Sequence, residues 1–197
     1  IVTTNVEHEA VRNLCSKLER DGVRVTRIEV DERGLIDPDQ VARSVTPLTA
    51  VVSVMHANNE TGVLFPVEEI ASLVKQRSDA IVHVDGVNAA GKAPVDLKNT
   101  GIDVYAVSGH KFHAPKGVGA VYIRGGIGLG PHLTGGGQEA GRRAGTEAVH
   151  QIAALGAAAR LAKDVSAMER VRQLRDRLEN EVLKMISDVS LNGDPVL

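Results

Sequence analysis

A lysine in a polar loop between two largely apolar runs is the residue of this sequence best suited to chemistry. Residues 108–119 read SGHKFHAPKGVG, and the runs 102–107 and 120–123 flank them. Loops held between buried strands are where a rigid scaffold presents functional side chains. An amine that loses solvation in such a place has a lowered pKa and becomes a nucleophile. We therefore expect Lys111 to form a Schiff base.

Other polar residues follow predicted strands and should lie at the same edge of a sheet. Asp85 ends the run 81–85, Asn58 and Asn59 follow the run 50–55, and His8 follows the run 1–4. Ligands of parallel α/β sheets bind at the carboxyl ends of the strands. An imine-forming lysine, together with an aspartate that can pair with a pyridinium nitrogen, is the arrangement that pyridoxal phosphate needs. An imidazole such as that of His8 could stack on the ring.

Each of these side chains also suits an ordinary structural role. An aspartate at a strand end is commonly a cap or a turn former, and two successive asparagines favour a turn. His8 could simply open a helix, and Lys116 suits the surface or a phosphate-facing position. The three glycines at 135–137 are by themselves weak evidence for a phosphate-binding loop. Only the combination of residues is specific.

Composition and charge argue against several other classes of function. A net charge of −2 provides no broad positive field for nucleic acid or a membrane surface, and aromatic residues that could stack on bases are scarce. No apolar run reaches membrane-spanning length, and no signal peptide is visible. Cys15, the single cysteine, cannot form an intrachain disulfide and is expected in the core. His83 and His113 lack the spacing of a zinc site, so no metal is expected.

Apolar spacing and turn signals predict alternating strands and helices. Strands are expected at 1–4, 23–30, 50–55, 81–85, 104–107 and 120–123, and helices at 11–20, 38–44, 66–74, 147–164 and 166–185. The alternation favours an α/β fold with a mostly parallel sheet, whose last two strands are antiparallel because their connection is short. Capping boxes are expected at Asp37 and Ser166. The apolar stripe of the last helix, from Met168 to Met185, is expected to pack in the core.

Both ends of the chain are expected to be cut from a longer protein. The sequence begins directly in a strand without Met and ends without the stop signal of a finished domain. We expect residues 1–188 to form one cofactor-binding large domain that is incomplete at its N-terminus. Residues 189–197 are expected to start a linker to a small C-terminal domain.

The sequence resembles the pyridoxal-phosphate cysteine desulfurases, and the related selenocysteine lyases, of the class-V aminotransferase group. Five stretches in family order carry the resemblance: Val6–His8, His56–Gly62, His83–Asp85, Ser108–Ala120 and Gly135–Thr146. Together they span nearly the whole chain. The resemblance implies the large domain of the aspartate-aminotransferase type of fold, a three-layer αβα arrangement with a mostly parallel mixed sheet and helices on both faces.

Site roles follow from the resemblance at the matched positions. Lys111 is implied to be the Schiff-base lysine that also moves protons, and Asp85 to pair with the pyridine nitrogen. His8 is implied to be a catalytic residue that stacks on the ring, and Asn59 to bond near the ring oxygen and the substrate carboxylate. The resemblance further implies cofactor contacts for Asn88, Ser108, His110 and, from the neighbouring subunit of a homodimer, Thr146.

The chain also departs from the family pattern. The family commonly has Gln where this chain has Asn88, and Ala140 stands where the family has Arg. Both changes are expected to affect cofactor affinity. The family's phosphate-binding turn would precede Ile1, while its nucleophilic cysteine and substrate-binding arginine would follow Leu197. Cys15 does not match the nucleophile, so the segment is expected to be inactive on its own.

The activity implied is that of a cysteine desulfurase, a sulfurtransferase that converts L-cysteine to L-alanine and leaves an enzyme persulfide for iron–sulfur cluster assembly and other sulfur-transfer pathways. Sulfur-acceptor or scaffold proteins are the implied partners. The implied location is the cytoplasm, or an organellar matrix if the source is eukaryotic. Selenocysteine lyase remains an alternative, because the residues thought to separate the two activities lie outside this segment. Another alternative is a non-catalytic folding or dimerisation core that binds cofactor weakly or not at all.

Overall fold

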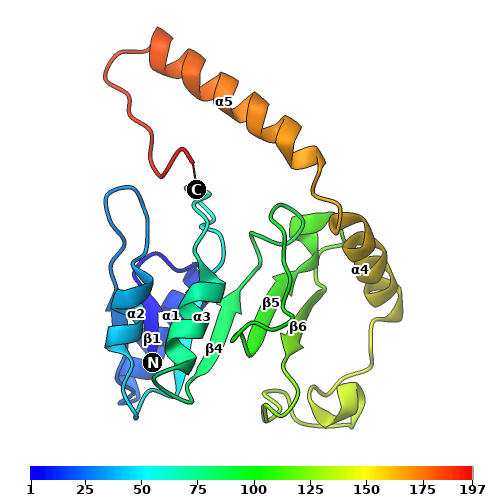
Figure 1. Cartoon of the computed structure of the whole chain (residues 1–197). Helices are drawn as coiled ribbons and strands as arrows, with labels where there is room; N and C mark the ends of the chain where they lie inside the picture. The colour runs from blue at the N-terminus through cyan, green and yellow to red at the C-terminus, as the bar shows by residue number, and fades with distance from the viewer. Residues whose placement is uncertain (197) are drawn as a thin grey trace.

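The computed structural model describes residues 1–196, which form a six-stranded sheet flanked by helices (Figure 1). In chain order the elements are β1 (Val2–Thr4), α1 (Glu9–Arg20), β2 (Thr26–Ile28), α2 (Pro38–Ser44), β3 (Val51–Met55), α3 (Val67–Lys75), β4 (Ile81–Asp85), β5 (Val104–Ser108), the 3-10 helix η1 (Gly109–Phe112), β6 (Gly119–Ile123), the 3-10 helix η2 (Gln138–Gly141), α4 (Val149–Ala162) and α5 (Ala167–Met185).

The strand order is β2-β1-β3-β4-β5-β6. Neighbouring strands are parallel except for β5 and β6, which are antiparallel. Right-handed crossovers place α1, which steps back from β1 to β2, on one face of the sheet. The same rule places α2 and α3, which step forward, on the opposite face (Figure 1). The predicted α/β class, mostly parallel sheet and antiparallel last pair are therefore confirmed.

The apolar core lies between the sheet and helices α2 and α3. Side chains alternate along β3 and β4, so every second residue of these strands points into this core. Its fully buried members include Val41, Val52, Val54, Ile70, Ala71, Val74, Val82 and Val84. This core fixes the strands whose ends carry the candidate site.

The opposite face of the same strands carries polar side chains. Ser53 and His83 are paired across β3 and β4, and the Ser53 hydroxyl lies 2.9 Å from His83 Nδ1. Met55 is paired with Asp85 two residues farther along. Because side chains alternate, His83 and Asp85 share this face, with Asp85 at the carboxyl end.

Helix α1 buries the Cys15 side chain and forms an ion pair with the edge strand β2. Cys15 is 4% exposed, and burial raises the pKa of its thiol. Arg27 of β2 pairs with Glu19 of α1 at 2.6 Å. The predicted core position of Cys15 is confirmed, and a buried thiol with a raised pKa is a poor nucleophile.

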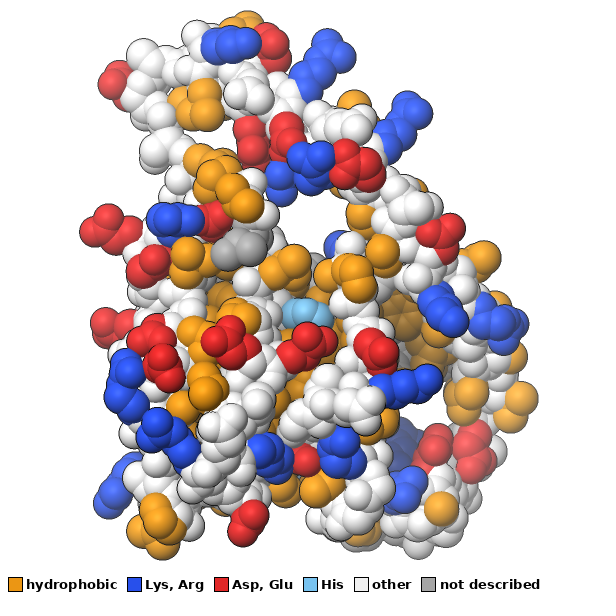
Figure 2. Space-filling model, viewed as in Figure 1, with side chains coloured by type: hydrophobic (Ala, Val, Ile, Leu, Met, Phe, Trp, Pro, Cys, Tyr) orange, Lys and Arg blue, Asp and Glu red, His pale blue; other side chains and the backbone are white. Residues whose placement is uncertain are grey.

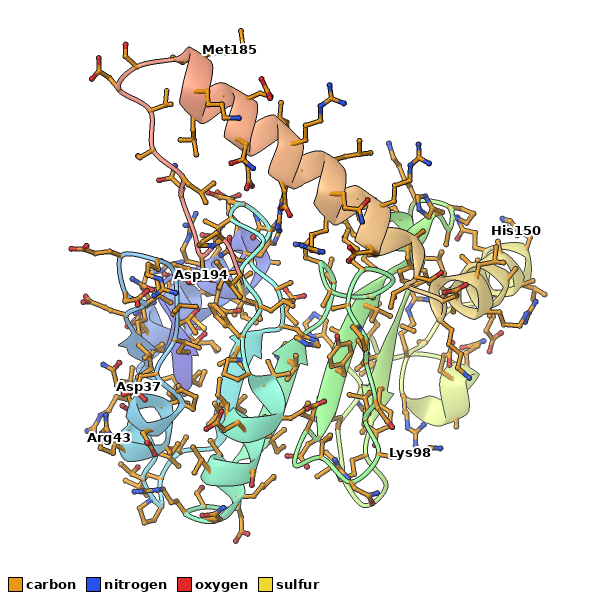
Figure 3. All side chains as sticks on the ribbon, turned by 45° about the horizontal axis from the view of Figure 1, so that its top comes forward. Asp37, Arg43, Lys98, His150, Met185 and Asp194 are labelled. Carbon is orange, nitrogen blue, oxygen red and sulfur yellow. The ribbon has the colours of Figure 1, made fainter. Side chains whose placement is uncertain are left out.

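Two local predictions near the N-terminus have different outcomes. Asp37 is the N-cap of α2 as expected, since its side chain accepts from the Asp39 N–H at 2.9 Å and pairs with Arg43 at 3.0 Å (Figure 3). The Gln40 side chain makes no return bond to Asp37 within residues 1–196, so the expected capping box is only half formed. The predicted strand 23–30 is shorter than expected, because only Thr26–Ile28 pairs with β1.

Asp103, which immediately precedes β5, anchors that strand to its neighbours. Asp103 is 2% exposed. Its carboxylate accepts from the Val82 N–H at 2.8 Å and pairs with Lys75 at 2.6 Å. Arg124, which follows β6, lies 3.6 Å from the other carboxylate oxygen. These contacts help to fix the register of β5 against β4, and the register determines the position of Ser108 and of η1 at the edge of the sheet.

Helix α5 corrects the prediction that its apolar stripe packs in the core. Leu174 and Leu178 are 56% and 65% exposed, and within residues 1–196 nothing covers them. Figure 2 shows open space between this helix and the body of the chain. The apolar spacing identified an amphipathic helix correctly, but spacing does not show what covers its apolar face.

The helix is supported instead by charged pairs along its surface. Arg172 pairs with Glu169 at 2.6 Å and with Asp176 at 3.2 Å. Pairs three and four residues apart stabilise a helix by a few tenths of a kcal/mol each. The predicted capping box at Ser166 is wrong, because its side chain makes no capping hydrogen bond and its backbone is already helical. Beyond Met185 the chain returns to the body, where Asp194 pairs with Arg33 (Figure 3).

Candidate functional site

Asp85 and Ser108 lie at the carboxyl ends of the neighbouring strands β4 and β5. Asp85 is paired with Ala106, and Ser108 follows two residues later, so both side chains are on the same face. Asp85 is partly buried, and its Oδ1 accepts from the Val87 N–H at 3.0 Å. The structure thus brings together two of the predicted cofactor contacts.

Lys111 and His110 lie on η1, directly beyond Ser108. The Ser108 hydroxyl is 2.8 Å from His110 Nδ1, which joins the two predicted phosphate contacts. Phe112 turns inward and packs near Ala158 of α4, while His110 and Lys111 stay exposed. The expected desolvation of Lys111 is therefore wrong, because the short helix buries Phe112 rather than the lysine.

A second lysine stands close to Lys111. Lys92 donates from Nζ to the Asn88 carbonyl at 2.7 Å and to Asn88 Oδ1 at 3.2 Å. Partial burial lowers the pKa of Lys92, and the charge of Lys111 lowers it further. The carboxyl edge of the sheet therefore carries two interacting amines.

His8 caps α1 at the end of the loop that follows β1. Its Nδ1 accepts from the Ala10 N–H at 3.2 Å, and its ring is exposed. The helix-opening role is confirmed, and capping leaves the face of the ring free for stacking.

The two predicted amide residues have different surroundings. Asn59 is exposed in the loop between β3 and α3. Asn88 is partly buried, and its Nδ2 donates to the Asn58 carbonyl at 2.9 Å. Its Oδ1 is the acceptor for Lys92, so both ends of this short amide are engaged with protein groups.

Glu7 is a buried carboxyl group that the sequence reasoning did not assign to the site. It is 3% exposed, and Oε1 accepts from the Thr4 hydroxyl at 2.7 Å and from the Met55 N–H at 3.0 Å. Within the described part of the chain its buried Oε2 has no hydrogen-bond partner. Burial raises the pKa of Glu7 to about 7, and the charge of Asp85 contributes to the rise.

Two further titratable groups share the surroundings of Asp85. Burial lowers the pKa of His83, while the charge of Asp85 opposes that change. Burial also raises the pKa of Tyr105, with a further contribution from Asp85, and its hydroxyl is 2.8 Å from His56 Nδ1. Gly86 permits this packing, because a Cβ there would lie 2.0 Å from the Tyr105 ring. The charge of Asp85 therefore affects the pKa values of Glu7, His83 and Tyr105.

Within residues 1–196, no hydrogen bond or ion pair joins Thr146 to the other predicted residues. Because β6 is antiparallel to β5, the chain leaves Ile123 at the end of the sheet opposite Ser108. The segment from there to α4 projects from that opposite end (Figure 1). Thr146 itself is exposed, and its neighbour Gly145 bonds within the segment, to Gln138.

Nearly the whole described segment matches a known family. The model of the class-V aminotransferases aligns with residues 1–194. The chain belongs to the class-V aminotransferase family. A cysteine desulfurase of Nostoc sp. is 50% identical over 196 residues, which are 98% of this chain and 49% of that protein. The chain thus spans about half the length of the curated relatives it matches.

Solved structures agree with the family membership. A NifS-like protein aligns with a TM-score of 0.84 and 37% identity, covering 93% of this chain and 50% of that one. SspA, solved in complex with cysteine, aligns with a TM-score of 0.82 and 32% identity over 91% of this chain and 52% of that one. These structures therefore share the fold of this chain.

The family is pyridoxal-phosphate-dependent, and the donor set at the strand ends has the chemistry that this cofactor requires. Asp85 offers a carboxylate for a protonated ring nitrogen, and Lys111 offers an exposed amine. Ser108 and His110 offer a paired hydroxyl and imidazole suited to a phosphate group. Asn88 fits less well, because its amide is already engaged. Within residues 1–196 no cluster of metal-ligating side chains is found, and none of the helices there is long and apolar enough to cross a bilayer.

Two of the residues at these strand ends, Glu7 and Lys92, were not singled out from the sequence. Glu7 is buried where the loop after β1 meets the end of β3, and that contact depends on the register of the two strands. Lys92 bonds to Asn88 within the loop after β4. The matched stretches contained Glu7 and Asn58, and the two successive asparagines also suited an ordinary turn. A charged residue next to a predicted site histidine was the available signal for Glu7.

Proposed function

We propose that the chain is the cofactor-binding large domain of a pyridoxal-phosphate-dependent cysteine desulfurase. The observation that carries the proposal is the placement of Asp85 and of the Ser108–Lys111 segment at adjoining strand ends. The similarity to cysteine desulfurases over 98% of the chain supports the same activity. The overall reaction joins L-cysteine and a protein thiol to give L-alanine and a persulfide, so the C–S bond breaks as an S–S bond forms.

The residues of this chain would divide the work as follows. The Asp85 carboxylate would hold the proton on the ring nitrogen, while the Ser108 hydroxyl and the His110 imidazole would hold the phosphate. His8 would stack on the ring, and Asn59 would orient the substrate carboxylate. When bound, pyridoxal phosphate supplies an electron-accepting ring that stabilises negative charge on the substrate α-carbon. Lys111 Nζ would bond the cofactor and then accept the α-proton.

We propose that the thiol that accepts the sulfur belongs to the part of the longer relatives that this chain does not cover. Cys15 is buried with a raised thiol pKa and cannot take this role. A homodimer is proposed for the same enzyme, in which the exposed Thr146 would serve the site of the partner. Sulfur-acceptor or scaffold proteins would receive the persulfide sulfur.

Replacing Lys111 by alanine in the longer protein is expected to lower alanine formation from L-cysteine by roughly 100- to 10,000-fold, the range for removal of a general acid–base group. The measurement is alanine release with L-cysteine as substrate. Lys98→Ala is the matched control, because Lys98 is exposed and belongs to the loop that leads into the amino end of β5 rather than to a carboxyl end (Figure 3). Unchanged turnover in Lys111→Ala would contradict the assignment. If the wild type converted selenocysteine but not cysteine, the substrate would be selenocysteine and the activity that of a selenocysteine lyase.

A further inference from the structure

The side chain of Asn58 is buried and fully hydrogen-bonded. Asn58 is 7% exposed, and its Oδ1 accepts from the backbone N–H groups of Glu60 and Thr61, both at 2.9 Å. Its Nδ2 donates to the Val6 carbonyl at 3.2 Å and lies 3.4 Å from Met55 Sδ. The carboxamide therefore does more than form the turn after β3.

The backbone of Asn58 extends the same network to a third loop. Its carbonyl accepts from Asn88 Nδ2 at 2.9 Å, and Lys92 in turn holds Asn88 from the outside. A continuous chain of hydrogen bonds thus crosses the loops that follow β1, β3 and β4. Asn58 therefore bonds to two other loops, to the loop after β1 through its side chain and to the loop after β4 through its backbone carbonyl.

Each of these three loops presents a residue of the candidate site. His8 comes two residues after Val6, Asn59 is the next residue after Asn58, and Asn88 belongs to the network itself. His8 and Asn59 are exposed, so packing does not hold them in place. Side chains that act together need supporting contacts to keep their relative positions.

We propose that Asn58 is a positioning residue for the cofactor site, which holds the loops carrying His8, Asn59 and Asn88 in one arrangement. The inference rests on the function proposed above. The acceptor and donor halves of the carboxamide have separable tasks. The turn needs only Oδ1, which aspartate also provides, whereas the bond to the loop after β1 needs the Nδ2 donor.

Asn58→Asp tests this separation, because it keeps the turn acceptor and replaces the donor with an oxygen that faces the Val6 carbonyl. Pyridoxal phosphate affinity, measured by absorbance titration, is expected to fall about tenfold, as for the loss of one buried hydrogen bond. Amide hydrogen exchange in residues 5–8 of the cofactor-free chain is expected to accelerate about tenfold, with α2 and α3 unchanged. A residue that only stabilises the fold would change exchange throughout the domain.

Two further variants complete the experiment. Asn5→Asp is the matched control, because Asn5 follows the same strand and its Oδ1 acceptor for the Val30 N–H survives the change. Asn58→Ser keeps an acceptor for the turn without a negative charge, and it replaces Asn58→Asp should that variant not fold. Wild-type affinity and wild-type exchange in residues 5–8 of the Asn58 variants would overturn the inference. Failure of the wild type to bind cofactor would overturn the proposed function instead, and the exchange result would still decide whether Asn58 holds the loops.

Discussion

Asp85→Ala is expected to weaken pyridoxal phosphate binding by roughly 10- to 100-fold, the cost of losing a hydrogen bond to a charged group. Asp85 ends β4 on the polar face of the sheet, partly buried and two residues from His83. Its carboxylate would face a protonated ring nitrogen, and in partly buried surroundings such a pair is screened less than at the surface. The dissociation constant from an absorbance titration of the purified chain measures the effect.

Asp96→Ala provides a closely matched control for this loss. Asp96 Oδ1 accepts from the Lys98 N–H at 2.9 Å, just as Asp85 Oδ1 accepts from the Val87 N–H at 3.0 Å. Both substitutions therefore remove the same local turn contact, and only one removes the proposed ring contact. Asp85→Asn keeps the turn contact and loses the charge, so it should bind nearly as weakly as Asp85→Ala. Equal affinities of the Asp85→Ala and Asp96→Ala variants would count against a role for Asp85 in cofactor binding.

The second large effect concerns Glu7 and is a dependence of stability on pH. The carboxyl pKa rises on folding from 4.5 to about 7, chiefly because of burial. The folded chain therefore holds this proton more tightly than the unfolded chain. The contribution to stability is complete below pH 4.5 and is lost as the pH rises through about 7. Between pH 5 and pH 8 the loss amounts to about 2 to 3 kcal/mol in the free energy of unfolding.

Glu7→Gln isolates this contribution from those of other titrating groups. Glutamine keeps an Oε1 acceptor for Thr4 and Met55 and carries no charge at any pH. Urea unfolding at pH 5 and pH 8 measures the free energy of unfolding of both proteins. The value for Glu7→Gln relative to the wild type should increase by about 2 to 3 kcal/mol from pH 5 to pH 8. Glu9→Gln, at an exposed position on α1, should show no such gain. Parallel pH profiles of the wild type and Glu7→Gln would show that the Glu7 proton is not linked to folding.

Much of the site could be predicted because its residues follow strands. The runs that correspond to β3, β4 and β5, with the polar residues at their ends, predicted Asn59, Asp85 and Ser108 at one edge before any contact was known. The polar face that carries His83 follows from the same alternation. For these residues, position along the chain determines position in the sheet.

The remaining features depend on contacts between segments that are distant in the sequence. The exposure of Lys111 depends on which side of η1 is buried, and Phe112 takes the inner side against α4. The burial of Glu7 depends on the loop after β1 meeting the end of β3 at Met55. The uncovered face of α5 has the same cause, because an amphipathic pattern does not identify a partner. Local patterns contain none of this information.

Borohydride reduction of the purified chain in the presence of pyridoxal phosphate tests the central claim most directly. Reduction converts an imine between the cofactor and a lysine into a stable adduct, which peptide mapping by mass spectrometry locates. We predict a single modified lysine, Lys111, and no adduct at this position in Lys111→Ala. An unmodified chain, or an adduct on Lys92 with Lys111 untouched, would contradict the assignment of the strand-end site.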